Sequence, residues 1–86
     1  MQEFRWNEDK NKYLKETRRV SFEEIVVSHF IGFKGHPSRG NQVILYFYLN
    51  DYVWLAPCVV EERYLFLKTA FPSRKHTKRY LKEGKP

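Results

Sequence analysis

The spacing of apolar residues changes along this chain, and the changes divide it into helical and extended segments. A short apolar–polar–apolar run at residues 4–6 indicates an edge strand. Asn7 follows as a candidate N-cap, and Glu8 and Asp9 then fall in the first turn, where the helix dipole favours negative charge. We therefore predict a first helix that starts after Asn7, carries a narrow apolar stripe and ends near residues 18–19.

The second predicted helix begins with a capping box at residues 21–24 (Ser-Phe-Glu-Glu), in which the first and last side chains satisfy each other's backbone donors. Apolar side chains then recur at helical spacing as far as Phe30, and Gly32 is expected to end the helix. His29 lies on the same stripe. We predict that it is a half-buried residue at the edge of the core and not a catalyst.

Residues 33–42 hold two glycines, a proline and small polar residues, which predicts a surface loop. Three β-type runs follow at residues 43–49, 52–60 and 64–70, and the short polar breaks between them indicate an antiparallel meander. The runs are almost continuously apolar, so both faces of the sheet should be largely covered, one by the first two helices. Pro57 predicts a bulge or an edge-facing position, because proline cannot donate to a ladder.

The stretch at residues 66–81 is typical of a strand end, a Pro-Ser hinge and a short helix capped by Ser73. The sequence therefore predicts an α+β fold for one domain over residues 1–86. Two N-terminal helices and a C-terminal helix would pack on a three- to four-stranded antiparallel sheet. At 100° per residue, Ser73, Thr77, Tyr80 and Leu81 fall on one side of the last helix, and Arg74, Lys75, Lys78, Arg79 and Lys82 on the other.

Composition narrows the class of protein. The chain has no run of about 18 apolar residues that would span a membrane. Residues 1–5 lack the basic-then-apolar pattern of a signal peptide. A single cysteine, Cys58, excludes an intramolecular disulfide and a multi-cysteine metal site, and its place in an apolar run predicts a small core residue. We expect a cytoplasmic protein that requires no cofactor and no membrane.

Charge points to the kind of partner. The net charge is +6, and residues 71–86 hold six Lys or Arg against one Glu, a net of +5. Such clustering favours a polyanionic partner or an acidic protein partner. The sequence shows no glycine-rich phosphate loop, metal-ligand spacing or nucleophile triad, so metal-dependent or covalent catalysis is not expected.

The remaining Lys, Arg, His and Tyr residues suit metal-free RNA cleavage. That reaction removes a proton from a 2′-hydroxyl, stabilises a phosphorane with cations and protonates the leaving 5′-oxygen. It would require Lys68, Arg74 and Lys75 to converge with His36 and Arg39 of the loop. The same residues would equally serve plain RNA or DNA binding, and each could also be a solvated surface charge.

Both ends of the chain resemble a known family. Residues 4–11 (Phe-Arg-Trp-Asn-Glu-Asp-Lys-Asn) and 20–24 (Val-Ser-Phe-Glu-Glu) resemble the opening of BrnT-like toxins of bacterial type II toxin–antitoxin modules. Residues 66–81 are similar to the same family's last strand and Arg-Lys-x-Thr helix, and residues 36–42 to the central His-Pro segment of one subgroup. The resemblance implies a RelE-like fold, growth inhibition by a ribonuclease, and neutralisation by a DNA-binding antitoxin encoded alongside.

The predicted function is therefore that of a toxin, a metal-independent endoribonuclease that cuts RNA, either free or on the ribosome, and inhibits translation. Two alternatives stay open: a non-catalytic nucleic-acid-binding protein, and an interaction module whose basic face meets an acidic protein. The resemblance points to Lys68, Arg74 and Lys75 as catalytic, and His36 is a further candidate. The predicted RNA-binding residues are Lys10, Lys15, Arg39, Lys78, Arg79 and Tyr80.

Overall fold

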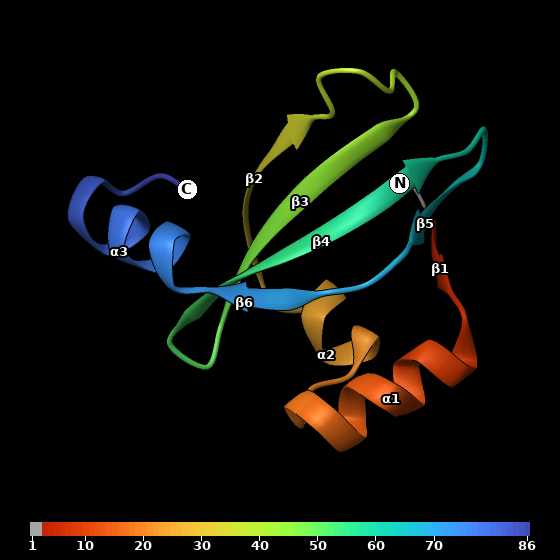
Figure 1. Ribbon diagram of the computed structural model, residues 1–86, viewed down its shortest axis with the longest axis horizontal. Coiled ribbons are helices and arrows are strands. Elements are labelled where there is room, and N and C mark those ends of the chain that lie inside the picture. The colour runs from red at the N-terminus through yellow and green to blue at the C-terminus, as the bar shows by residue number, and fades with distance from the viewer. Residues whose placement is uncertain (1–2) are drawn as a thin grey trace.

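The computed structural model describes residues 3–86, which form six strands and three helices (Figure 1). Residues 1 and 2, which carry part of the N-terminal pattern considered for a signal peptide, lie outside the described residues. The strands are β1 (Glu3–Trp6), β2 (His29–Gly35), β3 (Gln42–Leu49), β4 (Tyr52–Val60), β5 (Tyr64–Leu67) and β6 (Phe71–Ser73). The helices are α1 (Glu8–Arg18), α2 (Phe22–Val26) and α3 (Arg74–Glu83).

The strands form one mixed sheet in the order β1-β5-β4-β3-β2, and β6 pairs with β4 beyond the end of β5. Strands β3 to β5 pair antiparallel, as the predicted meander requires. Strand β2, which was not predicted, also pairs antiparallel with β3, whereas β1 runs parallel to β5. The predicted α+β class is confirmed. The prediction of a three- to four-stranded, wholly antiparallel sheet is wrong, because the described chain also uses β2 and β6 and pairs β1 in parallel.

The prediction of a long second helix is also wrong. Its capping box is present, but α2 ends at Val26, and the segment predicted as its second half forms β2. Val26 and Val27 stand at this end of the helix, and β-branched residues favour extended backbone. Ser28 closes the helix, since its backbone N and its Oγ both donate to Ile25 O, at 3.1 and 2.6 Å. His29 is therefore exposed on a strand and not half-buried on a helix.

The turns of the meander follow the sequence closely. Asn50 and Asp51 both have positive φ (53° and 66°), the geometry of a two-residue hairpin turn. Residues 58–60 of β4 pair with β5, and residues 53–55 of β4 pair with β6. Pro57 lies between these two parts of β4, at the crossover from one partner to the other. The missing N–H of Pro57 faces this crossover, so it costs no ladder hydrogen bond.

Helices α1 and α2 cover one face of the sheet, called here the core face (Figure 1). Leu14 of α1 and Phe22 and Ile25 of α2 are almost completely buried there. They pack on alternate residues of the central strands. The strand residues of this core are Leu45, Phe47, Trp54, Ala56, Cys58 and Leu67.

Asn11 joins the two N-terminal helices. Its side chain is 1% exposed, its Oδ1 accepts the backbone N–H of Phe22 at 2.8 Å, and its Nδ2 donates to a Glu23 carboxylate oxygen at 2.6 Å. The second bond is the main cause of a lowered pKa at Glu23. Cys58 is buried on the same face, as predicted, and its burial raises the thiol pKa to about 12.

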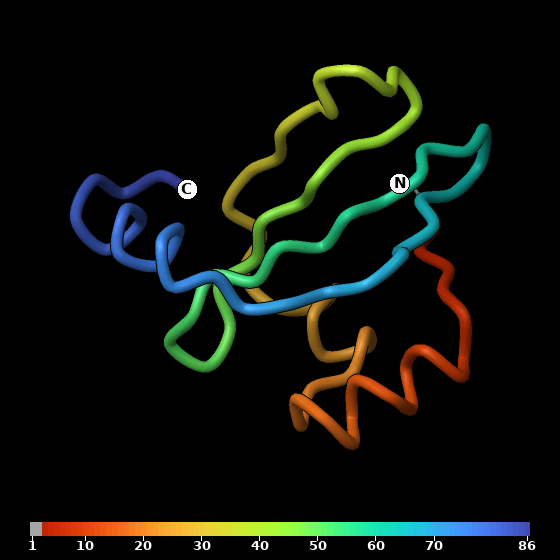
Figure 2. Tube along the Cα trace, viewed as in Figure 1, coloured from red at the N-terminus to blue at the C-terminus, as the bar shows by residue number. Residues whose placement is uncertain are grey.

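Helix α3 lies against the opposite face, called here the α3 face, and covers one end of it (Figure 2). Ser73 caps the helix as predicted, accepting the backbone N–H of His76 at 3.2 Å. Thr77 fixes α3 to the sheet, because its Oγ1 accepts the N–H of Val53 at 2.8 Å and donates to Ser73 O at 2.6 Å. Leu81, predicted on the same side of this helix as Thr77 and Tyr80, is 66% exposed.

Candidate nucleic-acid interface

The part of the α3 face that α3 does not cover is a partly exposed apolar surface, called here the floor. Ile44 of β3 pairs with Pro57 of β4, and Val59 of β4 pairs with Phe66 of β5. These four side chains alternate with the residues of the core face, and all are half-buried. An apolar floor that includes an aromatic ring suits the stacking of nucleic-acid bases.

Two lysines flank this floor. Lys34 of β2 pairs with Ile44, and the backbone N–H of Lys68, just after β5, donates to Pro57 O at 2.9 Å. One row across the sheet therefore runs Lys34, Ile44, Pro57, Lys68. At about 4.8 Å per strand, the two lysine backbones are about 14 Å apart. Both lysines are exposed, so the row presents a positive charge on each side of an apolar centre.

His76 lies where α3 meets the floor. Its ring stacks on Tyr46 of β3 with 5.4 Å between ring centroids and an interplanar angle of 29°. Its Nδ1 lies 2.7 Å from Ser73 Oγ, so the residue that caps α3 also holds the ring. The hydrogen bonds found among residues 3–86 leave its Nε2 unengaged. The ring is thus fixed through one nitrogen and presents the other for proton transfer.

The surroundings of His76 favour the neutral imidazole. Burial lowers its pKa from the ordinary value, and the positive charges of Lys75, Arg79 and Lys34 lower the pKa further. The same three charges would attract a phosphate group. A neutral imidazole at neutral pH among cations is a suitable general base for a reaction in which negative charge develops.

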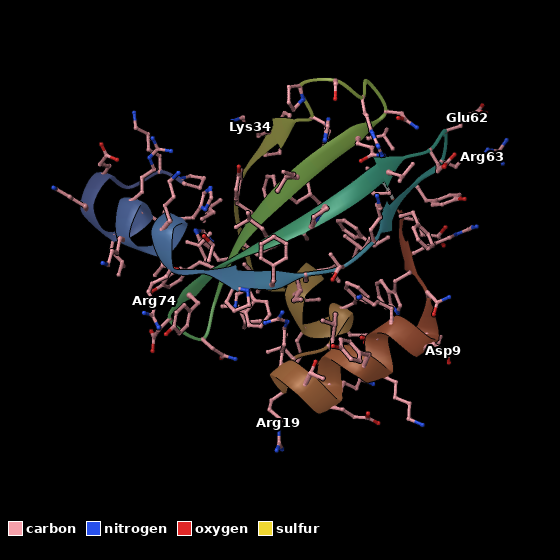
Figure 3. The ribbon with its side chains drawn as sticks, in the orientation of Figure 1. Asp9, Arg19, Lys34, Glu62, Arg63 and Arg74 are labelled. Atoms are coloured by element: carbon pink, nitrogen blue, oxygen red, sulfur yellow. The ribbon has the colours of Figure 1, made fainter. Side chains whose placement is uncertain are left out.

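The predicted catalytic residues of α3 fall on different sides of that helix. Lys75 is among the charges that act on His76, whereas Arg74 is exposed at the first helical position. At 100° per residue, Arg74 and His76 are about 200° apart around the helix axis. Figure 3 shows Arg74 directed away from Lys34. The structure brings Lys75 to the His76 cluster but not Arg74.

The predicted loop residues lie at the other end of the sheet. His36 donates its backbone N–H to Gln42 O at 3.0 Å, and its Nδ1 accepts the backbone N–H of Ser38 at 3.2 Å. Gln42 stands four residues before Tyr46 along β3, which corresponds to about 13 Å. His36 and the exposed Arg39 therefore lie outside the His76 cluster, at the far end of the same hairpin (Figure 2).

The predicted RNA-binding residues also lie on different parts of the molecule. Lys10 and Lys15 belong to α1, which packs on the core face, and the Lys10 ammonium lies 5.2 Å from the Tyr13 ring centroid. Lys78 is exposed on α3. Arg79 makes an exposed ion pair with Glu83 at 3.5 Å and donates to Pro86 O at 3.4 Å. Tyr80 packs on Tyr48 with ring centroids 5.1 Å apart, so it also fixes the helix.

Three residues of this site were not predicted from the sequence: His76, Tyr46 and Lys34. His76 stands next to the predicted inward side of α3, and its three-residue spacing from the cap Ser73 was a usable signal. Lys34 was hidden by the wrong prediction of a helix and loop where β2 forms. Tyr46 sits in a continuously apolar strand, so the sequence did not show which face it occupies.

Residues 3–86 contain no group of three His, Cys, Asp or Glu side chains placed to hold a metal ion. In the same part of the chain, no helix has both the length and the apolar character needed to cross a membrane. No family model matches the chain, and no curated protein and no solved structure matches it at a significant level.

Proposed function

We propose that this protein is a BrnT-like toxin with a RelE-like fold, a cytoplasmic endoribonuclease that cuts RNA without a metal ion. The observation that carries the proposal is the position of His76. It is held by Ser73, stacked on Tyr46 and surrounded by three positive charges beside an open apolar floor. The resemblance of both chain ends to BrnT-like toxins supports the same interpretation.

The chemistry follows from these positions. Bases lie on the floor, and a phosphate lies between Lys34 and Lys75. With Nδ1–H donating to Ser73, Nε2 of His76 removes the 2′-hydroxyl proton. The 2′-oxygen then bonds to phosphorus and the bond to the 5′-oxygen breaks, while the cations stabilise the phosphorane. The Lys75 ammonium protonates the leaving oxygen, so the products are a 2′,3′-cyclic phosphate and a 5′-hydroxyl.

The other cations extend this surface. Lys68 holds the RNA backbone on the far side of the floor, and Arg74 and Lys78 continue the positive charge along the exposed side of α3. A DNA-binding antitoxin encoded by an adjacent gene is the proposed protein partner. The substrate is RNA, either free or on the ribosome.

A second candidate is a nucleic-acid-binding protein without catalysis. The floor and its flanking lysines favour it, because stacking and phosphate contacts need no proton transfer. The two candidate functions differ in whether they require the His76 side chain. Binding alone would survive its replacement, and cleavage would not.

The test is induced expression in a bacterial host together with RNA cleavage by purified protein in a metal chelator. Wild type is compared with His76→Ala, with Arg74→Ala and with His29→Ala, a matched control at an exposed histidine that lies opposite Tyr48 and has no role in the proposed reaction. Wild type and His29→Ala should arrest growth and degrade RNA. His76→Ala should relieve the arrest and lower the cleavage rate by about 10²- to 10⁴-fold, the usual contribution of a general base.

Each other outcome decides between the candidate functions. Cleavage retained in folded His76→Ala but lost in Arg74→Ala would place the centre at Arg74, where the sequence predicted it. Normal growth and intact RNA with folded wild-type protein would favour the binding protein. Cleavage that stops only on addition of the chelator would contradict metal independence.

A further inference from the structure

Part of the core face is not covered by a helix. Helices α1 and α2 pack against one part of it, and beyond them lies an apolar groove of about 370 Å³. Its walls include Phe4 of β1, Leu65 of β5 and, on β2, Phe30 and Phe33. The two β2 side chains are the most open, at 50% and 68% exposed. Within this groove, the exposed apolar surface is thus concentrated on β2.

That strand also ends the sheet. β2 pairs with β3 on one side, and within residues 3–86 its outer edge has no strand partner. An edge strand offers a row of unpaired N–H and C=O groups, which another extended chain can complete. Apolar side chains and a free backbone edge therefore occur together on β2.

The two sides of β2 differ in character. Phe30 and Phe33 pair with Phe47 and Leu45, so they face the groove, whereas Lys34 pairs with Ile44 and faces the α3 side. A strand added beside β2 would bring alternate side chains next to these two environments. One set would complete the apolar groove, and the other would lie beside the exposed ammonium of Lys34.

We propose that the outer edge of β2 binds an extended segment of an acidic partner protein as an added strand. The segment alternates apolar residues, directed to the groove, with Asp or Glu, directed to Lys34. Recognition by strand addition gains affinity from main-chain hydrogen bonds and specificity from alternate side chains. The groove and the strand edge lie outside the proposed ribonuclease site and only Lys34 belongs to both, so binding at this interface is measured without reference to ribonuclease activity.

The charge of the molecule favours an acidic partner over a second copy. Each copy carries a net charge of +6, and each of two β2 strands side by side would bring an exposed Lys34 to the shared edge. Like charges across a strand pair are destabilising.

The probe is a synthetic eight-residue peptide that alternates glutamate and valine, with a lysine–valine peptide as its matched control. Amide hydrogen exchange and chemical shifts are followed by NMR on labelled full-length protein. The acidic peptide should slow exchange of the outward-facing β2 amides. Lys34→Glu, an exposed substitution that leaves the fold intact, should weaken binding of the acidic peptide by about three- to fivefold for each ion pair removed and favour the lysine peptide.

Phe33→Ser should also weaken binding of the acidic peptide, since it removes exposed apolar surface beside the edge. Unchanged exchange of the β2 amides at saturating peptide would overturn the proposal. So would equal binding of the two peptides, or helix formation by the bound peptide. Protection of the β2 edge that depends only on the protein's own concentration would identify a second copy as the occupant and refute an acidic partner.

Discussion

Where α1 and α2 cover the core face, alternate residues of β3 and β4 are sealed, whereas the α3 face is sealed only beneath α3 and stays partly open beyond it. Phe47 and Trp54 are 2% and 5% exposed, while Pro57 and, on β5, Phe66 are half-buried. The sealed side chains hold the strands in place. The open ones then form a firm floor without needing a helix above them. A small domain can in this way use the helix-covered part of its sheet for stability and leave an uncovered part for a ligand.

The largest expected effect separates the aromatic residues that stabilise the core face from those that form the floor. Phe47→Ala removes a buried ring from the core face, and we expect it to lower the free energy of unfolding by about 3–5 kcal/mol. Phe66→Ala removes a half-exposed ring from the floor and should cost less stability but weaken RNA binding. Urea unfolding and RNA titration of both variants measure the two effects. Equal losses of stability would contradict the division between the faces.

The next effect concerns the attachment of α3. Thr77→Val keeps the shape of the side chain but leaves the buried N–H of Val53 without its acceptor, at a cost of about 1–3 kcal/mol. Thr17→Val is the matched control, because Thr17 is exposed and bonds only within its own helix. Its change should stay within about 0.5 kcal/mol. If the two variants unfold at the same urea concentration, Thr77 does not fix α3 to the sheet.

The smallest effect is a pH dependence on the α3 face. Because the pKa of His76 is lowered on folding, the unfolded chain binds its proton more readily. His76 therefore contributes stability that is present above its unfolded pKa of about 6.5 and is lost as pH falls through its lower folded pKa. Lys34→Met removes one cause of the shift, so the His76 pKa should rise in an NMR titration of the ring. Lys15→Met, on α1, is the control.

That last experiment bears directly on the electrostatics of the site. A His76 pKa that does not move in Lys34→Met would show that the Lys34 ammonium does not act on the ring. An equal rise in Lys15→Met would show that net charge, and not the position of the lysine, sets the pKa. Either result would weaken the argument that His76 sits in a local cluster of cations.

Much of the fold could be predicted because its signals are local. The caps Asn7, Ser21 and Ser73 and the turn at residues 50–51 each depend on side chains near them in sequence. Strand β2 could not be predicted, since its apolar residues also fit a helix and only pairing with β3 makes it a strand. The parallel pairing of β1 with β5 joins distant segments and leaves no local pattern.

The candidate site could be predicted in part for the same reason. The cluster of Lys and Arg in residues 71–86 drew attention to α3. Helical spacing then separated its exposed cations from Thr77. The His76 cluster required knowing that Tyr46 and Lys34 share a face with α3, which depends on strand register. A one-residue error in register exchanges the two faces. The family resemblance pointed to Arg74, but its position at the start of α3 directs it away from the ring.

The parallel pairing of β1 and β5 also affects how the chain acquires its structure during synthesis. Glu3–Trp6 is made first, yet its partner Tyr64–Leu67 is made after most of the chain. Closing so long a segment costs chain entropy and slows folding. The meander of β2 to β4 can form from neighbouring segments while β1 waits. Among the strands of residues 3–86, β1 is therefore made before the others and yet is among the last to join the sheet, because its place is not formed until β5 has been translated.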